Sequence, residues 1–495
     1  MSDTRLKDRI IQALWRAADA DANVVSATLA GSFVNAASLE GLSDIDFIVV
    51  VDRLDAVAFD MLQRDFEAAV RPVLADAGYD FRLNATLGPL KFNAPKLAVL
   101  HLMPYSRAAH VEHVVNSPFT CLDWQRSPYF RKQSLADVYP TFGLQPRHFL
   151  SARRSIADYL NDYRGRVVSY RELQCDDKGY SERKCHKPMD DRDRHEFAYH
   201  VMRFLMLNLL KLVRRCPERA ATLEGLMDCF FELYPDGERE ARGLLLALAD
   251  KKRRVDYAVP IEDLDVRLER FVADFERQFR HDFIETATRH LTFRHAATEA
   301  NTGPVRFLGR SDLPILEVDE PSDALAKLRR ALEQVEPMRH FSSPLRRCVQ
   351  SMGLAAGPEV EPEVDSRLVE MDYGRCELMT VGKCREEHGD LFEAWGRRED
   401  PRFPDGENSA DVTSRALAFA EEQWSTGSVN TATCTHNVVL RSLVGHAVGV
   451  PEHDRHRIAV PHLTPIEFVA TRRFGLFVNL DESVERAMFA GFAAA

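Results

Sequence analysis

Long apolar runs are missing from this 495-residue chain: none approaches the roughly 18 consecutive apolar residues that a membrane-spanning helix needs. Met1-Ser2-Asp3-Thr4 begins a polar segment of mixed charge instead of the apolar core of a signal peptide. The nine cysteines are irregularly spaced, which does not describe a disulfide framework and suits a reducing compartment. These absences predict a cytoplasmic protein that does not cross a membrane.

An excess of positive charge is also missing, since the chain has 65 Lys and Arg residues but 76 Asp and Glu residues, and the net charge is −11. A nucleic-acid backbone attracts positive charge, so this balance favours small-molecule partners over nucleic acid. The composition, 45% hydrophobic and 28% charged, is that of a soluble globular protein. The length is that of about two or three domains, each able to bury its own core.

The pattern of apolar residues divides the chain into three regions. Residues 1–115 alternate helix and strand, with apolar strand runs at Val24–Leu29 and Phe47–Val51. Residues 116–285 are predicted to be helical, with a polar loop at Gln174–Arg194, and residues 286–495 return to αβ alternation. Two apolar helix stripes define the middle region: Phe197, Val201, Phe204, Leu205, Leu209 and Leu212, and Leu264, Leu268, Phe271, Phe275 and Phe279. We therefore expect a multidomain α/β protein with a helical middle domain.

Two aspartates, Asp44 and Asp46, stand at the start of the second predicted strand. Gly31-Ser32 is followed, after eleven residues, by Asp44-Ile45-Asp46 and an apolar run. Residues two apart in a strand share a face, so both carboxylates would face one site while Ile45 faces the core. Two carboxylates suit a magnesium ion that also binds triphosphate oxygens. Gly31 lets the backbone approach a phosphate, to which Ser32 can donate a hydrogen bond.

This arrangement resembles the DNA-polymerase-β-like nucleotidyltransferase superfamily, with its Gly-Ser turn and Asp-apolar-Asp strand. The resemblance covers the first region only. It implies transfer of a nucleoside monophosphate from a nucleoside triphosphate to an acceptor, with release of pyrophosphate. The helical region would then bind the acceptor.

The resemblance also implies a third carboxylate on a later strand, where the segment from Lys96 to Leu102 offers no acid. His101 is the nearest candidate, because its apolar neighbours would face the core and its own side chain the site. Asp80 on the preceding strand competes with it, and a merely hydrogen-bonding His101 is the alternative. With His101 as a neutral third ligand, the site would bind magnesium weakly and favour a metal such as manganese.

Four short segments follow one another in the last region. They are Leu291 to Asn301 with Arg294-His295, Ser342 to Arg347, Leu368 to Gly374 with Glu370, and Thr435-His436-Asn437. In this order they resemble the motifs of the histidine phosphatase superfamily, the phosphoglycerate-mutase-like proteins. The resemblance runs from Leu291 to the end of the chain and implies a three-layer α/β domain.

The resemblance implies a phosphomonoester hydrolase that needs no cofactor and uses His295 as its nucleophile. Arg294, Arg346 and His436 would hold the phosphoryl group, and Glu370 would protonate the leaving oxygen. Asn301 would help to shape the pocket.

Two glycines of the family are replaced in this chain. Ala296 follows the first histidine and Asn437 follows the second. Each adds bulk beside the phosphate, and each is strained only where the backbone needs a positive φ.

Together these patterns predict a bifunctional enzyme. One site would use magnesium or manganese to transfer a nucleoside monophosphate to a small molecule, and the other would hydrolyse a phosphorylated small molecule through a phosphohistidine. One alternative is a toxin-like nucleotidyltransferase that modifies RNA or protein, supported by the basic run Arg183, Lys184 and Lys187. The other is a scaffold with one degenerate domain, supported by the missing third carboxylate.

Overall fold

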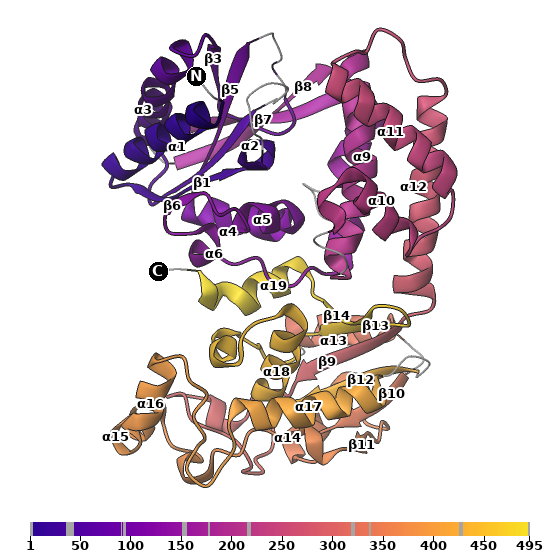
Figure 1. Ribbon diagram of the computed structural model, residues 1–495. Coiled ribbons are helices and arrows are strands. Elements are labelled where there is room, and N and C mark those ends of the chain that lie inside the picture. The colour runs from indigo at the N-terminus through magenta and orange to yellow at the C-terminus, as the bar shows by residue number, and fades with distance from the viewer. Residues whose placement is uncertain are drawn as a thin grey trace. The chain divides into compact units, whose positions relative to one another are not determined.

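The computed structural model describes residues 3–35, 44–90, 92, 96–150, 156–176, 179–214, 219–317, 322–335, 338–424 and 429–493. The chain divides into two compact units (Figure 1): Met1–Thr141 with His148–Phe275 and Ala493–Ala495, and Phe142–Arg147 with Glu276–Phe492. In the described ranges no helix is both long and apolar enough to cross a membrane. Much of the spacer between Ser32 and Asp44 lies outside these ranges.

The first unit begins with a five-stranded mixed sheet of order β3-β5-β2-β1-β6. Strand β6 pairs with β1, so the sheet continues past the predicted boundary at residue 115. The elements are α1 (Asp3–Ala20), β1 (Val24–Ala30), α2 (Gly31–Asn35), β2 (Ile45–Val51), α3 (Ala56–Ala75), β3 (Asp80–Asn84), β4 (Thr86–Leu87), β5 (Leu97–Ser106), α4 (Arg107–Asn116), α5 (Pro118–Gln125), β6 (Phe130–Lys132) and α6 (Leu135–Val138).

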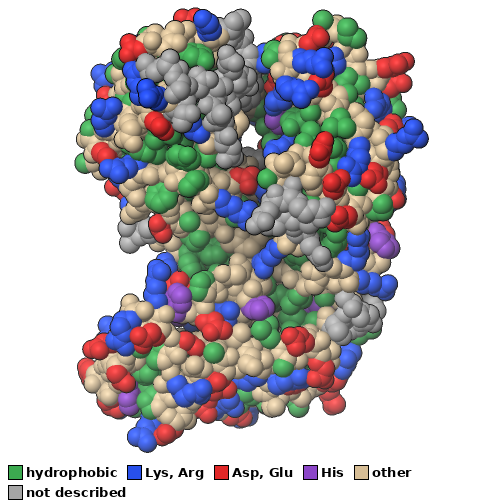
Figure 2. All heavy atoms as spheres, in the orientation of Figure 1, with side chains coloured by type: hydrophobic (Ala, Val, Ile, Leu, Met, Phe, Trp, Pro, Cys, Tyr) green, Lys and Arg blue, Asp and Glu red, His purple; other side chains and the backbone are tan. Residues whose placement is uncertain are grey.

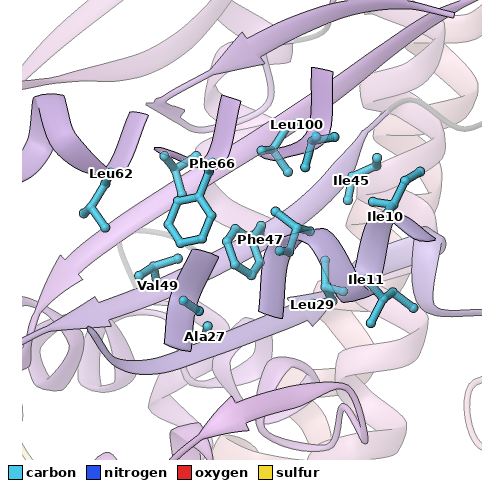
Figure 3. Close-up of a cluster of buried hydrophobic side chains, with 14 of the residues drawn as sticks. Ile10, Ile11, Ala27, Leu29, Ile45, Phe47, Val49, Leu62, Phe66 and Leu100 are labelled. Carbon is cyan, nitrogen blue, oxygen red and sulfur yellow. The ribbon is translucent and has the colours of Figure 1, made fainter. Parts of the chain in front are cut away.

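Alternation along the strands gives this sheet two different faces. Ile45, Phe47 and Leu100 pack with residues of α1 and α3 in one apolar cluster (Figure 3). Because side chains alternate along a strand, Asp46 and His101 lie on the opposite face. The predicted orientation of Ile45 towards the core is confirmed.

The rest of the first unit is mainly helical. Its elements are α7 (Arg147–Leu150), α8 (Ile156–Gly165), β7 (Val167–Asp176), β8 (Gly179–Pro188), α9 (Asp191–Leu212), α10 (Leu223–Phe231), α11 (Glu238–Arg254) and α12 (Leu264–Arg280). Helix α9 contacts α8, α10 and α11, which explains its apolar surface. The predicted stripe of α12 is buried along its whole length, from Leu264 to Phe279.

The predicted polar loop at 174–194 is wrong, because β7 and β8 form a long antiparallel hairpin there and α9 begins at Asp191. This hairpin lacks the apolar alternation that is typical of strands, and ion pairs between its two strands stabilise it instead. Arg183 bonds Glu172, which lies directly opposite it, and Arg171 lies 2.7 Å from Glu182. Strand β4 pairs with β7 and joins the hairpin to the end of β3.

The second unit contains a six-stranded sheet of order β11-β10-β12-β9-β13-β14. Its first four strands are parallel to one another, and β13 runs antiparallel to both of its neighbours, β9 and β14. The elements are β9 (Thr288–Arg294), α13 (Asp323–Glu333), β10 (Met338–Ser342), α14 (Arg346–Ala356), β11 (Glu363–Val364), α15 (Val381–Glu387), α16 (Gly389–Gly396), α17 (Ser409–Gln423), β12 (Asn430–Thr435), α18 (Asn437–Val448), β13 (Ile466–Thr471), β14 (Gly475–Asn479) and α19 (Glu482–Phe489).

Parallel pairing brings three strand ends to one edge of this sheet. Strands β10, β12 and β9 are neighbours, and Ser343, His436 and His295 each follow the last residue of their strand. Leu291 and Phe293 of β9 pack into an apolar cluster with α13 and α14 and anchor the strand below this edge. The edge beyond the carboxyl ends of parallel strands is where α/β sheets bind ligands.

Candidate functional sites

His295 stands at the centre of the edge beyond β9, β12 and β10. Its backbone N–H donates to the carbonyl oxygen of Thr435 over 3.0 Å, which ties it to the neighbouring strand. Its ring Nδ1 lies 2.7 Å from the carbonyl oxygen of Ala296, so Nδ1 carries the proton and donates. Nε2 therefore keeps its lone pair. Burial, with the nearby Arg347 charge, holds the pKa of His295 well below its ordinary value, so the ring is neutral and nucleophilic.

His436 faces His295, with ring centroids 5.1 Å apart. Its Nδ1 accepts from Nε of Arg347 over 3.2 Å, and its Nε2 lies 2.8 Å from the hydroxyl oxygen of Ser343. Burial lowers the pKa of His436 well below its ordinary value, and the neutral ring therefore carries its proton on Nε2. Donation to a phosphoryl oxygen would need this same N–H.

The structure corrects the second arginine of the predicted pocket from Arg346 to Arg347. Arg346 is exposed, whereas the Arg347 side chain is fully buried. The Nη1 and Nη2 atoms of Arg347 donate to the carbonyl oxygens of Ser311 and Gly309 over 2.7 and 2.8 Å. These bonds aim its guanidinium at His436.

Helix periodicity explains this error. Cys348, Met352 and Ala355 form the buried stripe of α14, and Arg347 lies on the same face. Arg346 is two residues before Cys348, about half a helical turn away. The apolar stripe was therefore the signal that would have identified the buried arginine.

Glu370 lies beside the amino terminus of α18. One carboxylate oxygen accepts from the backbone N–H of Met371 over 2.9 Å and from that of Val438 over 3.2 Å. Burial raises the pKa of Glu370, although these bonds and the nearby arginines work against the shift. A buried carboxyl with a raised pKa is suited to act as a general acid.

Arg294, the last residue of β9, supplies a second guanidinium. Its Nη1 donates to the carbonyl oxygen of Val460 over 2.9 Å, while its Nε is buried with no hydrogen-bond partner in the described part of the chain. Burial lowers the pKa of Arg294 to about 10, so the group stays charged near neutral pH. An unsatisfied buried donor marks a place where a ligand oxygen would be stabilised.

Asn301 does not join this cluster. It is exposed, and its side-chain oxygen accepts from the backbone N–H and the hydroxyl of Thr298, both over 3.0 Å. The side chain caps a short 3-10 helix, Glu299–Asn301.

The two glycine replacements cause no backbone strain. Neither Ala296 nor Asn437 is among the described residues that have a positive φ. Asn437 is the first residue of α18, where ordinary helical geometry suits any side chain.

His462 was not predicted from the sequence. Its Nδ1 donates to the carbonyl oxygen of His295 over 2.5 Å, and the two ring centroids are 5.3 Å apart. Burial lowers the pKa of His462 to about 4. No motif quoted from the sequence contains this residue, which reaches the site because Leu463 bonds to Arg294.

The first unit holds the other predicted site at the start of β2. Gly31 has φ +70°, and a Cβ on it would lie 2.1 Å from Oδ2 of Asp46. Glycine is therefore required for the turn and for the close approach of the Asp46 carboxylate. Asp44 is buried just before the strand, and Ser32 is exposed.

His101 lies directly opposite Asp46 on the neighbouring strand β5. Its Nδ1 is 3.0 Å from an oxygen of Asp46, and its Nε2 is 2.7 Å from the carbonyl oxygen of Thr86. Burial alone would lower the pKa of His101, but the hydrogen bond and charge of Asp46, with the charge of Asp44, raise it. Both ring nitrogens are thus engaged by protein oxygens.

The metal-binding role predicted for His101 stays a prediction, since both of its ring nitrogens contact protein oxygens here. Within the described ranges no three or more His, Cys, Asp or Glu side chains are arranged to hold a metal ion. Asp80, the competing candidate, is exposed at the far end of β3 from Asn84, the residue opposite His101. Asp44 and Asp46 remain as possible ligands of the type that magnesium prefers.

Comparison with known proteins places a family domain in the second unit. A model of the histidine phosphatase superfamily (branch 1) matches residues 291–478. Phosphoserine phosphatase 1 of Hydrogenobacter thermophilus is 28% identical over 166 residues, which are 32% of this chain and 74% of that protein.

Solved structures give similar matches. A mycobacterial glucosyl-3-phosphoglycerate phosphatase is 22% identical, over 39% of this chain and 97% of that one, with a TM-score of 0.34. YhfR of Bacillus stearothermophilus is 23% identical, over 39% of this chain and 96% of that one, with a TM-score of 0.34.

Proposed function

Because residues 291–478 form a histidine phosphatase superfamily domain, we propose that this chain hydrolyses a phosphomonoester at His295. The observation that carries the proposal is the bond from Nδ1 of His295 to the carbonyl oxygen of Ala296, which leaves Nε2 free to attack. The phosphoserine phosphatase named above makes small phosphorylated metabolites the substrate class to test first.

The reaction would take two steps. Nε2 of His295 bonds to phosphorus while the bond from phosphorus to the ester oxygen breaks, and Glu370 gives its proton to that oxygen. Water then attacks the phosphohistidine, gives a proton to Glu370 and releases phosphate. Arg294, Arg347 and the Nε2–H of His436 would stabilise the charge on the phosphoryl oxygens.

Removal of metal tests this proposal. Full-length protein should hydrolyse p-nitrophenyl phosphate equally well with and without EDTA, because every group in the proposed mechanism is a side chain. Release of p-nitrophenol is followed by its absorbance. Hydrolysis that EDTA abolishes would contradict the histidine mechanism.

Replacement of each of the two adjacent arginines in turn is a second test. Arg347→Met should lower kcat/KM for a phosphomonoester by about 10² or more, because a buried cationic donor is lost. Arg346→Met is the matched control and should change it by less than about threefold, because an exposed side chain touches no reacting group. Thermal unfolding of both variants shows whether the loss follows from misfolding. If both variants lowered kcat/KM equally, Arg347 could not be assigned in place of Arg346 as the second phosphate-binding arginine.

Nucleotidyl transfer in the first unit is the second candidate function. The supporting observation is the packing of Asp46 against Gly31, next to Asp44 at the start of a buried strand. Asp44 and Asp46 would hold magnesium or manganese, which would neutralise the triphosphate. His101 would fix the orientation of the Asp46 carboxylate through its hydrogen bond.

The basic run that supported an RNA or protein substrate is largely paired. Arg183 bonds Glu172, and Lys187 lies 2.6 Å from Asp193. Positive and negative side chains are also interspersed across the face shown in Figure 2. These features favour a small-molecule acceptor, with the phosphatase acting on a phosphorylated small molecule.

A further inference from the structure

Cys376 and Cys384 form a pair of buried thiols that the proposed mechanism does not use. Their sulfur atoms lie 3.0 Å apart, and both residues are free cysteines in the structure. Cys376 ends a short 3-10 helix, Gly374–Cys376, and Cys384 lies on α15. A disulfide bond is about 2.05 Å long, so the two sulfurs need to approach by about 1 Å to form one.

The backbone on the Cys376 side of the pair is firmly held. A Cβ on Gly374 would lie 2.0 Å from the carbonyl oxygen of Pro404, so these two segments pack without space between them. The backbone N–H of Cys376 donates to the carbonyl oxygen of Tyr373 over 2.9 Å. The movement that brings the sulfurs together is therefore expected on the Cys384 side.

Helix α15 is a surface element that can supply this movement. Cys384 is the one buried side chain among its seven residues, all of which are described. Leu378, between the two cysteines, has φ +61°, a left-handed conformation that is unfavourable for leucine. A short element with few buried contacts opens locally more easily than the core does.

Opening of α15 controls the reactivity of the pair. Burial, with the hydrogen bond to Cys376, raises the pKa of Cys384 to about 12. A thiol with so high a pKa is unreactive, because the thiolate is the nucleophile. Oxidation is therefore expected to follow a local opening that brings Cys384 to the solvent.

Glu377 connects this segment to the phosphatase site. Its carboxylate accepts from the backbone N–H groups of Gly309 and Ser311 over 3.0 to 3.1 Å. The carbonyl oxygens of the same two residues accept from the guanidinium of Arg347. Because Glu377 follows Cys376 directly, opening of this segment would loosen the loop that orients Arg347.

We propose that Cys376 and Cys384 are a reversible oxidation site, at which a peroxide converts the two thiols into a disulfide that holds α15 closed. The thiolate of one cysteine attacks a peroxide oxygen, the O–O bond breaks, and that sulfur becomes a sulfenic acid. The second sulfur attacks the first, forms the S–S bond and displaces the hydroxyl group, which leaves as water with the second thiol's proton. Two thiols lose two electrons in total, and one hydrogen peroxide becomes two waters.

The disulfide should protect the phosphatase domain and leave its activity in place. It removes open conformations of the segment, as a covalent link between nearby residues does. Because the movement falls on α15, Glu377 keeps its bonds to the loop that orients Arg347. A dithiol reductant restores both thiols by exchange. This site goes beyond the proposed phosphatase function and does not depend on it.

Peptide mapping tests the chemistry. Full-length protein is treated with hydrogen peroxide, blocked with iodoacetamide under denaturing conditions and digested with trypsin without reduction. Cleavage after Arg375, Lys383 and Arg385 releases residues 376–383 and 384–385 as separate peptides, which a disulfide would join. The joined peptide should appear in the oxidised parent and disappear after dithiothreitol.

Variants of single cysteines show whether the pair is specific. Cys384→Ala and Cys376→Ala should each abolish the joined peptide, and two variants guard against a folding defect in one. Cys229→Ala is the matched control, because it removes a buried cysteine of the other unit and should leave the joined peptide unchanged.

Native proteolysis tests the protective role. Trypsin cleavage at the exposed residues Lys383 and Arg385, followed on reducing gels, should be slower by about tenfold or more in the oxidised parent than in the reduced parent. Peroxide should not slow this cleavage in Cys384→Ala. Hydrolysis of p-nitrophenyl phosphate by the parent should change by less than about threefold on oxidation.

The outcomes separate this site from the phosphatase function. Separate alkylated peptides after peroxide treatment would overturn the oxidation site. A joined peptide without slower cleavage, or with a large loss of hydrolysis, would overturn the protective role. A reduced parent that hydrolyses no phosphomonoester would overturn the proposed function alone, because mapping and proteolysis need no turnover.

Discussion

His295→Ala should lower phosphomonoester hydrolysis by a factor on the order of 10³ or more. The substitution removes the imidazole whose Nε2 would bond to phosphorus, and within the described cluster His436 cannot replace it. The Nε2 of His436 carries a proton and faces Ser343, while its Nδ1 is occupied by Arg347. Steady-state phosphate release measures the loss.

His281→Ala is the control for that experiment. His281 lies in the same unit, and its side chain is 62% exposed, so its loss should leave hydrolysis unchanged. Comparable thermal unfolding of both variants shows that the His295 variant is folded. A His295→Ala enzyme that retains a substantial fraction of parent activity would mean that another group is the nucleophile.

Asp46→Asn should reduce metal-dependent turnover of nucleoside triphosphates by about 10² or more, while phosphomonoester hydrolysis persists. Asparagine keeps the shape of the side chain but removes the charge that would hold the metal. The two predicted sites belong to different units and share no residue. The effect is measured as pyrophosphate release. The assay contains magnesium or manganese, and a metabolite extract supplies the acceptor.

Asp52→Asn is a matched control because Asp52 follows the other end of β2 and its side chain is 58% exposed in a pair with Arg107. It should release pyrophosphate at the parent rate. Pyrophosphate release by Asp46→Asn at the parent rate would remove Asp46 from the site. A parent enzyme without metal-dependent turnover would favour a degenerate first domain.

Features with a strong local period were predictable from the sequence. The stripe on α12 and the buried run of β2 follow directly from apolar spacing, and both lie as expected. The orientation of His101 towards the face of Asp46 was also predictable, since strand residues alternate. Two motif histidines, His295 and His436, meet because their strands are parallel neighbours.

What escaped prediction depends on contacts between distant segments. The β7–β8 hairpin is held by cross-strand ion pairs and by pairing with β4, and neither leaves an apolar pattern in the sequence. The engagement of His101 by Thr86 depends on the turn after β3. His462 reaches His295 through the backbone bond from Leu463 to Arg294, which no short motif encodes.

Identification of the phosphorylated atom tests the central claim most directly. Full-length enzyme is mixed with a radiolabelled phosphomonoester and quenched rapidly without acid, since a phosphohistidine hydrolyses in acid. Peptide mapping then locates the label and distinguishes the two ring isomers. The structure predicts phosphate on Nε2 of His295, because Nδ1 donates to Ala296, and no label in His295→Ala. Label on Nδ1 or on another residue, or no label during active turnover, would contradict the account.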